Sequence, residues 1–374
     1  MTESLRVVIA GGGTGGHLYP GIAVAREIVR RRPGAQVTFA GTSRGLEARV
    51  VPREGFELDL IRSAGLKGKS ITSRLRGAAL LVPGLADAWR LLSRRRPQVV
   101  VGVGGYSSGP VVLLAALRRI PTIVLEQNAV PGLTNRWLSR VVRAAAVTYD
   151  ETLPFFRGRG FLSGNPVRPE FLAEFENAKL EVRRSKAVDG PQAEPHAPRV
   201  LIVGGSQGAH AINVAGVAAA PELVRKHPGL ALVHQTGERD LAPVTEGYRR
   251  AGIPARTESF IDPMVGEMSA ADLVICRAGA TTLAELAVLG RPAVLVPFPA
   301  AADDHQRRNA RALVSAGAAE RIDQADLSGP KLAEAVDRLL SDPARLDAMS
   351  RAMRQMARPD AAGAIVDRLV ALAG

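Results

Sequence analysis

The sequence predicts an α/β protein made of two Rossmann-like domains that face each other across a cleft. The segment RVVIAGGGTGGH (residues 6–17) aligns without gaps to RVLIVGGSQGAH (residues 199–210). Each is a β-branched strand that runs into a glycine turn and then a helical pattern, the first unit of a doubly wound sheet. Strand-like and helix-like segments then alternate along both halves of the chain, as in parallel sheets with helical crossovers. The 374 residues suffice for two domains of roughly 150 to 200 residues each.

The alternation predicts the elements of each half. In the first half we expect strands at residues 6–10, 36–40, 98–103, 121–125 and 144–148, and helices at 20–31, 44–53, 85–95, 109–118 and 133–140. In the second half we expect strands at 199–203, 230–234, 272–276 and 292–296, and helices at 209–225, 281–289, 304–316 and 330–340. Prolines that follow helices and precede strands support these limits, because proline cannot extend a helix.

The same pattern predicts the domain boundaries. We expect an N-terminal domain at 1–165 and a C-terminal domain at 166–352. A charged stretch that becomes rich in proline and alanine predicts a linker at about 175–198. The remaining residues, 353–374, are expected to form a helix that packs back on the first domain.

Composition excludes several classes of protein. A single cysteine, Cys276 in the apolar run DLVIC, rules out a disulfide framework and fits a reducing compartment. The N-terminus has no signal-peptide pattern, and no stretch approaches about 18 uninterrupted apolar residues. We therefore expect a protein that is soluble or attached to a membrane surface.

The net charge of +13 is concentrated in one stretch. Between residues 62 and 96 there is one acid, Asp87, against nine basic residues: Arg62, Lys67, Lys69, Arg74, Arg76, Arg90, Arg94, Arg95 and Arg96. A nucleic-acid surface would interleave aromatic side chains, and this stretch has only Trp89, so we expect no nucleic-acid partner. Apolar residues rimmed by arginine favour an anionic membrane surface, anchored by Arg94 to Arg96. The alternative is a core helix with a basic end; in both cases Pro83-Gly84 predicts a loop or turn before the helix.

The first glycine loop formally matches a dinucleotide fingerprint, with Gly11, Gly13 and Gly16 at the required spacing. The acid that should end the second strand is missing, because Gly41 and Thr42 stand there. Arg44 could serve an NADP variant, which leaves an oxidoreductase as an alternative. Two glycine loops, one per domain, instead indicate a cleft in which a nucleotide-sugar and an acceptor meet.

The second half carries candidate donor-binding residues in CRAGATTLAELAVLGRP (276–292). Small residues precede Thr281 and Thr282, which open a helix whose N-terminus suits a diphosphate. Glu285, one turn further, can reach ribose hydroxyls, or it is an ordinary solvated glutamate. In the next segment, VPFPAAADDHQRRNA, Gln306 and Asn309 could bond sugar hydroxyls. Its Asp303-Asp304-His305 run lacks metal-ligand spacing, so we expect neither a metal nor a cofactor.

In the first half, polar residues follow two more strands. GVGGYSSGP (102–110) is another glycine loop, and LEQNAVPGLTNRWL (125–138) follows the next strand. Glu126, Gln127 and Asn128 thus fall at the same carboxyl edge of the sheet as His17, where doubly wound sheets bind ligands.

These residues together resemble one family. GGTGGHLYPG, GVGGYSSGP, LEQNAVPGLTNRWL, SGNPVR, VGGSQGAHAIN, FIDPM, CRAGATTLAELAVLGRPAVLVPFP and DDHQRRNA occur in the order of the MurG family, the peripheral membrane N-acetylglucosaminyltransferases of peptidoglycan synthesis, which have the two-domain GT-B fold. Glycolipid synthases that glycosylate diacylglycerol and UDP-sugar epimerases share the scaffold. A nucleotide-sugar binder without activity is a further alternative.

The resemblance implies a reaction and a set of site residues. N-acetylglucosamine would pass from UDP-N-acetylglucosamine, with inversion and without metal, to the 4-hydroxyl of undecaprenyl-diphospho-N-acetylmuramoyl-pentapeptide at the cytoplasmic face of the inner membrane. The implied donor contacts are Thr14, Gly15, Gly16, Asn128, Arg168, Ser206, Ile261 through its backbone, Ala280, Thr281, Thr282, Leu283, Ala284, Glu285 and Gln306. The implied acceptor contacts are Gly13, Gly104, Gly105 and Tyr106.

A base must take the proton of the acceptor hydroxyl in such a displacement. His17 can act as that base, since an imidazole titrates near neutral pH. Glu126 is the rival, and a third possibility is that His17 only holds its loop by hydrogen bonding. The loop from Gly11 to Gly16 would then bind the acceptor diphosphate rather than a cofactor.

Overall fold

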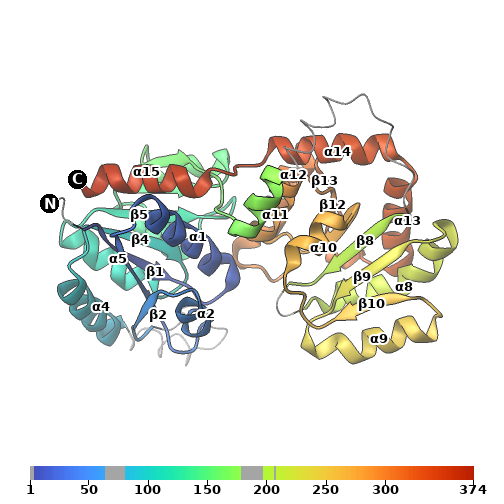
Figure 1. Ribbon diagram of the computed structural model, residues 1–374, viewed down its shortest axis with the longest axis horizontal. Helices are drawn as coiled ribbons and strands as arrows, with labels where there is room; N and C mark the ends of the chain where they lie inside the picture. The colour runs from blue at the N-terminus through green and yellow to red at the C-terminus, as the bar shows by residue number, and fades with distance from the viewer. Residues whose placement is uncertain (1–3, 64–80, 178–196, 206–207) are drawn as a thin grey trace. The chain divides into compact units, whose positions relative to one another are not determined.

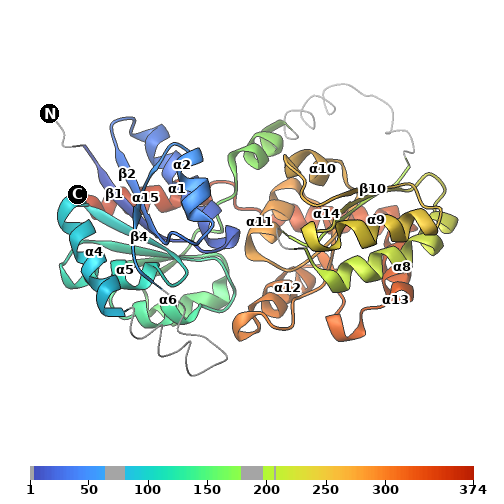
Figure 2. The same cartoon turned by 90° about the horizontal axis from the view of Figure 1, so that it is seen from below.

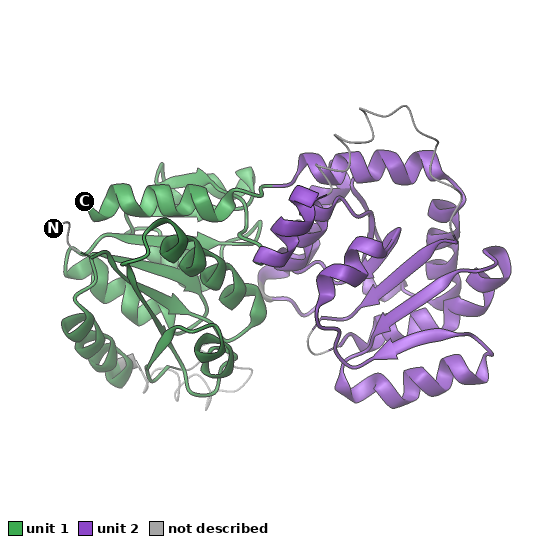
Figure 3. Cartoon of the chain, in the orientation of Figure 1, with its two compact units in different colours: residues 1–168, 358–374 green, residues 169–357 purple. Residues whose placement is uncertain are grey.

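The computed structural model describes residues 4–63, 81–177, 197–205 and 208–374. The chain forms two compact units (Figure 3). Unit 1 contains Met1–Arg168 and Arg358–Gly374, and unit 2 contains Pro169–Ala357.

The sheet of unit 1 has seven parallel strands in the order β3-β2-β1-β4-β5-β6-β7 (Figure 1). The strands are β1 Arg6–Gly11, β2 Gln36–Gly41, β3 Glu57–Leu60, β4 Val99–Gly104, β5 Thr122–Glu126, β6 Ala144–Val147 and β7 Gly160–Leu162. The five predicted strands are present, and β3 and β7 were not predicted. The strand order changes direction between β1 and β4: β2 and β3 follow outward from β1 on one side, and β5, β6 and β7 follow outward from β4 on the other. A doubly wound sheet opens a crevice for ligands at this point.

Helices cover both faces of this sheet. They are α1 Gly15–Arg31, α2 Glu47–Arg53, α4 Leu81–Arg95, α5 Ser108–Leu117, α6 Leu133–Leu138 and α15 Ala361–Ala373, with a 3-10 turn at Asp150–Phe156. Figure 2 shows α1 and α15 on one face and α4, α5 and α6 on the other. Successive residues of β1 point to opposite faces, so Val7 and Ile9 pack with α1 and α15 while Val8 and Ala10 pack with α4 and α5.

Several helix limits differ from those predicted, and three of the differences bear on the site or the domain boundary. Helix α1 begins at Gly15 rather than at residue 20, so the last residues of the glycine loop form its first turn. The described part of helix α4 starts at Leu81, so Pro83-Gly84 lies within the helix and not in a loop or turn before it. The expected helix at 353–374 instead begins at Ala361, because Pro359 separates it from α14.

Unit 2 has a six-stranded parallel sheet in the order β10-β9-β8-β11-β12-β13. Its strands are β8 Arg199–Val203, β9 Ala231–Gln235, β10 Ala255–Glu258, β11 Leu273–Cys276, β12 Ala293–Leu295 and β13 Ala319–Arg321. Its helices are α8 His210–Lys226, α9 Leu241–Arg250, α10 Met264–Ala270, α11 Ala280–Leu289, α12 His305–Ser315, α13 Gly329–Leu340 and α14 Pro343–Gln355. The four predicted strands are present, and the short edge strands β10 and β13 were not predicted.

The core of unit 2 lies between its sheet and helices α8 and α13. Cys276 is buried on β11, and burial raises the pKa of its thiol to about 12. In the ranges that the structure describes, no helix combines the length and the apolar character needed to cross a membrane.

Candidate active site

The first glycine loop joins β1 to α1 at the carboxyl edge of the unit 1 sheet. Gly11, Gly12 and Gly13 all have positive φ (138°, 138° and 87°), which side-chain-bearing residues rarely adopt. A Cβ at Gly11 would lie 2.3 Å from the carbonyl oxygen of Gly104, so the loop can touch β4 only as glycine. Thr14, the N-cap of α1, makes no side-chain capping bond. The exposed residues Gly13, Thr14 and Gly16 therefore present backbone and a helix N-terminus to a ligand.

Glu47 of α2 lies behind this loop. Its carboxylate is only 1% exposed and accepts hydrogen bonds from the backbone N–H of Gly13 (2.7 Å) and from the N–H and hydroxyl of Thr42 (both 2.9 Å). The sequence analysis did not single out this residue. Gly41 and Gly45 were the sequence signal that could have indicated a buried side chain here, because a Cβ at either position would collide with the Glu47 side chain.

His17 lies in the first turn of α1, between two other loops of unit 1. Its ring occupies the space that a Cβ of Gly104 would take, 2.9 Å from Nδ1, and Gly104 has a φ of 98°. The ring Nδ1 is 3.2 Å from Oε1 of Gln127, which follows β5. Gly105 has a φ of 79° and approaches Gly12, and Tyr106 is half exposed beside it. Unit 1 thus brings the loops after β1, β4 and β5 together around His17.

Glu126 ends β5 and is 3% exposed. Its carboxylate accepts hydrogen bonds from the N–H of Asn128 (3.1 Å), the N–H of Gly132 (3.1 Å) and Nδ2 of Asn135 (2.8 Å), and a longer one from Nδ2 of Asn128 (3.4 Å). Burial raises the pKa of the Glu126 carboxyl, and the hydrogen bonds from Asn135, Asn128 and Gly132 oppose that rise. The carboxylate therefore fixes the path of the loop from β5 to α6. Asn135, also buried, helps to hold the Glu126 carboxylate, and the sequence analysis missed this residue.

Arg168 lies at the end of the 1–168 segment of unit 1. Its guanidinium carbon is 5.5 Å from the centroid of the Tyr19 ring, which lies one turn after the glycine loop on α1. The contact keeps this predicted phosphate ligand near the carboxyl edge of the unit 1 sheet.

The second half of the predicted site lies at the carboxyl edge of the unit 2 sheet. Helix α11 begins at Ala280, and its N-cap, Gly279, has no side chain to cap it. Ala280 and Leu283 are buried, whereas Thr281, Thr282 and Ala284 are half-buried. Glu285 is 4% exposed, so it is not the solvated helix glutamate considered as an alternative.

Loops after β9, β10 and β12 add to this edge. The N–H of Ile261 donates to Oε1 of Gln235 (3.1 Å), whose Nε2 donates to the carbonyl of Gly205 (3.0 Å), so the Ile261 loop is tied to the second glycine loop. Gln306 is the second residue of α12, and its Oε1 accepts from the N–H of Phe298 (2.9 Å). Ser206 lies outside the described residues.

The side chain of Asn309 makes a contact inside unit 2. It is fully buried, and its amide donates to the carbonyl of Ala278 (3.2 Å). Asn309 therefore holds the loop after β11 to α12. The prediction that it bonds a sugar hydroxyl is not supported by this geometry.

Arg277, directly after β11, is a residue that the sequence analysis missed. Its guanidinium donates to the carbonyl of Val296 (3.1 Å) and to Oε1 of Gln324 (2.7 Å), and it stacks over Phe298 at 5.3 Å. Burial lowers the pKa of this guanidinium. The residue ties the loop after β12, which carries the predicted sugar ligand, to the adjacent strand.

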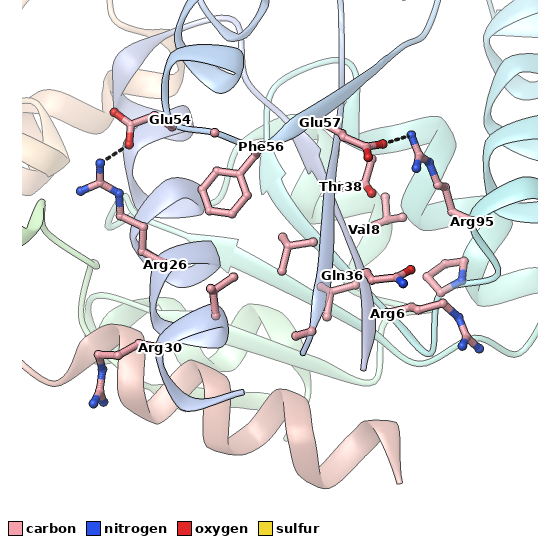
Figure 4. A pocket seen from close by; sticks show the side chains of 16 residues that line it. Arg6, Val8, Arg26, Arg30, Gln36, Thr38, Glu54, Phe56, Glu57 and Arg95 are labelled. Carbon is pink, nitrogen blue, oxygen red and sulfur yellow. Dashed lines mark hydrogen bonds and ion pairs between the residues drawn. The ribbon is translucent and has the colours of Figure 1, made fainter. Parts of the chain in front are cut away.

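A pocket in unit 1 lies at the opposite, amino edge of the sheet (Figure 4). Figure 4 shows Arg26 directed at Glu54 and Arg95 directed at Glu57, and both are ion pairs. Arg30 also lines the pocket and pairs with Glu27, whereas Arg6 donates to the carbonyl of Arg96. None of the predicted donor, acceptor or catalytic residues lines this pocket. Among the described residues, no group of three or more His, Cys, Asp or Glu side chains is placed to hold a metal ion.

Two family models match the chain. The glycosyltransferase family 28 N-terminal domain matches residues 7–147, and the family 28 C-terminal domain matches residues 199–365. Among curated proteins, the UDP-N-acetylglucosamine--N-acetylmuramyl-(pentapeptide) pyrophosphoryl-undecaprenol N-acetylglucosamine transferase of Anaeromyxobacter sp. (strain K) is 48% identical, covering 97% of this chain and 92% of the relative. The protein of the same name from Pelobacter propionicus is 47% identical, covering 98% and 99%.

A solved structure agrees with these relatives. The crystal structure of Acinetobacter baumannii MurG is 30% identical and superposes with a TM-score of 0.78, covering 98% of this chain and 99% of that one. The two parallel-sheet α/β units are therefore those of a GT-B glycosyltransferase. The chain belongs to glycosyltransferase family 28 and, within it, to the MurG family of N-acetylglucosamine transferases.

Proposed function

We propose that this enzyme transfers N-acetylglucosamine from UDP-N-acetylglucosamine to the 4-hydroxyl of undecaprenyl-diphospho-N-acetylmuramoyl-pentapeptide, with inversion at the anomeric carbon. The observation that carries the proposal is the identity of 47–48% over almost the full length of relatives named for this transfer. The product would be the lipid-linked disaccharide used in peptidoglycan synthesis, which links the enzyme to cell-wall biogenesis and cell division.

The donor is proposed to bind unit 2. The N-terminus of α11 has no side-chain cap, so its backbone N–H groups and positive dipole end can receive the diphosphate. Glu285 would accept from the ribose hydroxyls, and Gln306 would bond the sugar. Ile261 would contact uracil through its backbone. Thr14, Gly15, Gly16, Asn128 and Arg168 of unit 1 and Ser206 would complete the contacts.

The acceptor is proposed to bind unit 1. The backbone of the β1–α1 loop and the N-terminus of α1 suit its diphosphate, since no side chain caps that helix either. Gly13, Gly104, Gly105 and Tyr106 would contact it.

His17 is proposed as the general base. Its Nε2 would take the 4-hydroxyl proton as that oxygen attacks the anomeric carbon, and the bond from this carbon to the diphosphate would break with both electrons leaving on UDP. The α11 N-terminus and Arg168 would stabilise the leaving diphosphate without a metal. Glu126 fits the role less well, because its buried carboxylate already accepts hydrogen bonds from three residues of its own loop.

An anionic membrane surface is proposed as the partner of the α4–α5–α6 side of unit 1, at the cytoplasmic face of the inner membrane. Val82, Trp89, Leu117 and Trp137 are 53–74% exposed on these three helices. The guanidinium of Arg118 lies 4.7 Å from the Trp89 ring. Apolar side chains beside arginines suit the interface of a bilayer that contains anionic lipid.

We propose that cations other than Arg94 to Arg96 serve this surface. Arg94 and Arg95 form ion pairs with Asp59, and Arg95 also pairs with Glu57. These carboxylates come from β3, outside the basic stretch in the sequence. Because these pairs offset charge on Arg94 and Arg95, we place the proposed anchor at the arginines around α5 and α6 instead of at Arg94 to Arg96.

A transfer assay tests the proposal. The purified enzyme is given radiolabelled UDP-N-acetylglucosamine and the lipid-linked acceptor, with and without EDTA. We expect label in the lipid fraction at equal rates in both. Binding of the donor without transfer would show a nucleotide-sugar binder, and transfer to diacylglycerol alone would show a glycolipid synthase; either result would overturn the proposal. Loss of activity in EDTA would overturn its metal-independent form.

A further inference from the structure

Gln127 is buried between β4 and the ring of His17. The side chain is 2% exposed and follows β5 directly. Its Nε2 donates to the carbonyl oxygen of Val103 in β4 (3.1 Å), and its Oε1 lies 3.2 Å from Nδ1 of His17. One amide thus joins two adjacent strands to the first turn of α1, across 110 positions in the sequence.

These contacts determine which nitrogen of His17 carries the proton. The carbonyl of Val103 can only accept a hydrogen bond, so the NH₂ group of Gln127 must face it. The amide oxygen then faces His17, and because this oxygen can also only accept, Nδ1 must be the donor. A neutral imidazole with its proton on Nδ1 has its lone pair on Nε2. The ring cannot shift away from Gln127, since the backbone of Gly104 packs against it.

We infer that Gln127 is a positioning residue that fixes the Nδ1–H tautomer of His17, so that Nε2 is the basic nitrogen offered to the acceptor hydroxyl. The inference rests on the proposed role of His17. A catalytic imidazole is usually oriented by a carboxylate. Here the neutral amide of Gln127 takes that place, and it holds the tautomer without adding a negative charge.

The other charged groups near the loop of His17 make hydrogen bonds or stacking contacts of their own. The Glu126 carboxylate of β5 is held by Asn128, Gly132 and Asn135, and that of Glu47 on α2 by Gly13 and Thr42. On α1 itself, Tyr19 stacks with Arg168. The amide oxygen of Gln127 contacts Nδ1, and the bond from the Gln127 NH₂ group to the Val103 carbonyl fixes this oxygen as the atom that faces the ring.

Nitrogen-15 NMR of the histidine-labelled enzyme tests the tautomer without turnover. We expect His17, assigned by the loss of its signals in His17→Asn, to show a protonated Nδ1 and an unprotonated Nε2 at pH 8. Gln127→Met should return the ring to the mixture of tautomers of an ordinary histidine. A wild-type ring protonated at Nε2, or an unchanged tautomer in Gln127→Met, would overturn the inference.

Kinetics of a second variant keep the test independent of folding. Gln127→Glu retains an acceptor oxygen but adds a charge, so the acidic limb of the kcat/KM profile should move up by about one pH unit or more. Gln127→Met should lower kcat on the order of tenfold, since general-base help is worth about 10²–10⁴-fold and part of it remains. Gln98→Met is the matched control, because Gln98 accepts from the N–H of Arg6 at the opposite edge of the same sheet.

The possible failures can be told apart. If the wild-type enzyme transfers no sugar but NMR shows the Nδ1–H tautomer lost in Gln127→Met, the proposed function fails and the positioning by Gln127 stands. If transfer occurs and the pH profile of Gln127→Glu matches that of the wild type, the positioning role fails.

Discussion

The backbone N–H of Gly13 donates to Oε2 of Glu47, at 2.7 Å, across 34 positions in the sequence. The same carboxylate binds Thr42, so one buried side chain joins the first glycine loop to the loop after β2. The donor of Gly13 is therefore engaged from behind, and the loop has a fixed shape before any ligand arrives. Preorganisation of this kind lowers the cost of binding.

We predict that Glu47→Ala destabilises unit 1 by about 3 kcal/mol, because the partly buried N–H groups of Gly13 and Thr42 and the hydroxyl of Thr42 all lose their buried acceptor, at roughly 1 kcal/mol each. Both tryptophans, Trp89 and Trp137, lie in unit 1, so urea unfolding followed by tryptophan fluorescence reports on it. The variant should also raise KM for the lipid-linked acceptor more than KM for UDP-N-acetylglucosamine.

Glu54→Ala is the matched control. Glu54 pairs with Arg26 at the surface, at the other end of α2, and an exposed pair of this kind contributes about 0–1 kcal/mol. Equal losses of unfolding free energy in the two variants would show that the Gly13–Glu47 contact stabilises unit 1 no more than an exposed ion pair does.

Glu126→Gln separates a structural carboxylate from a catalytic one. The amide oxygen of glutamine can replace one oxygen of the carboxylate, but its NH₂ group would face donors such as Nδ2 of Asn135. We therefore predict that the variant loses both stability, by about 1–3 kcal/mol, and transfer activity. Fluorescence unfolding and the transfer assay measure the two effects. A variant that is fully stable yet inactive would instead assign the base to Glu126.

The sequence predicted the sheets better than it predicted the contacts between side chains. The buried strands were visible as apolar runs, whereas β3, β7, β10 and β13 have only three or four residues and lie at or next to a sheet edge. The start of α1 was missed because its first two residues, Gly15 and Gly16, are glycines, which are poor helix formers. Glu47 and Gln127 act on residues 34 and 110 positions away, and no local pattern encodes such a contact. The missed strand β3 also supplies Glu57 and Asp59, so the sequence alone did not reveal the ion pairs of Arg94 and Arg95.

Glu285→Gln should weaken donor binding by about 1–3 kcal/mol, the scale of losing hydrogen bonds to a charged group. Glutamine keeps the size of the buried side chain, which an alanine at this 4% exposed position would not. Calorimetric titration with UDP-N-acetylglucosamine measures the loss, and Glu334→Gln, on the exposed side of α13, is the control. Unchanged affinity in Glu285→Gln would end the assignment to the ribose.

A buried histidine in unit 2 predicts a pH dependence of stability. His234 is fully buried, its Nδ1 lies 2.9 Å from the Tyr248 hydroxyl, and its Nε2 lies 3.0 Å from Oδ1 of Asn213. Burial lowers the pKa of His234 from 6.5 to about 4. Between these values the unfolded chain binds a proton that the folded protein does not, so this contribution is present above pH 6.5 and lost as the pH falls toward 4.

The loss should be on the order of 3 kcal/mol at pH 4. Urea unfolding followed by circular dichroism, in steps from pH 7 to pH 4, compares the wild type with His234→Gln. The variant should be less stable at pH 7 and should lose less stability on acidification. Parallel curves for the two proteins would contradict the buried, neutral state of this imidazole.

The proposed membrane surface is tested by co-sedimentation with vesicles. Arg118 and Arg140 lie on the α5–α6 side of unit 1, and neither forms an ion pair among the described residues. Each cation near an anionic bilayer is worth about 1 kcal/mol, so changing both to Ser should weaken binding on the order of tenfold or more. Trp89→Ser should weaken binding to all vesicles, because it removes apolar contact rather than charge.

Changing Arg239 and Arg351 of unit 2 to Ser removes the same charge elsewhere and should leave vesicle binding close to that of the wild type. Binding of the wild type should rise with the fraction of anionic lipid and fall with salt, because the Debye length shrinks from about 10 Å at 0.1 M salt to about 3 Å at 1 M. If neutral and anionic vesicles sediment equal amounts of protein, the arginines do not contribute and the attachment is apolar alone. If the unit 2 variant loses as much binding as the α5–α6 variant, the attraction comes from the net charge of +13 and not from one surface.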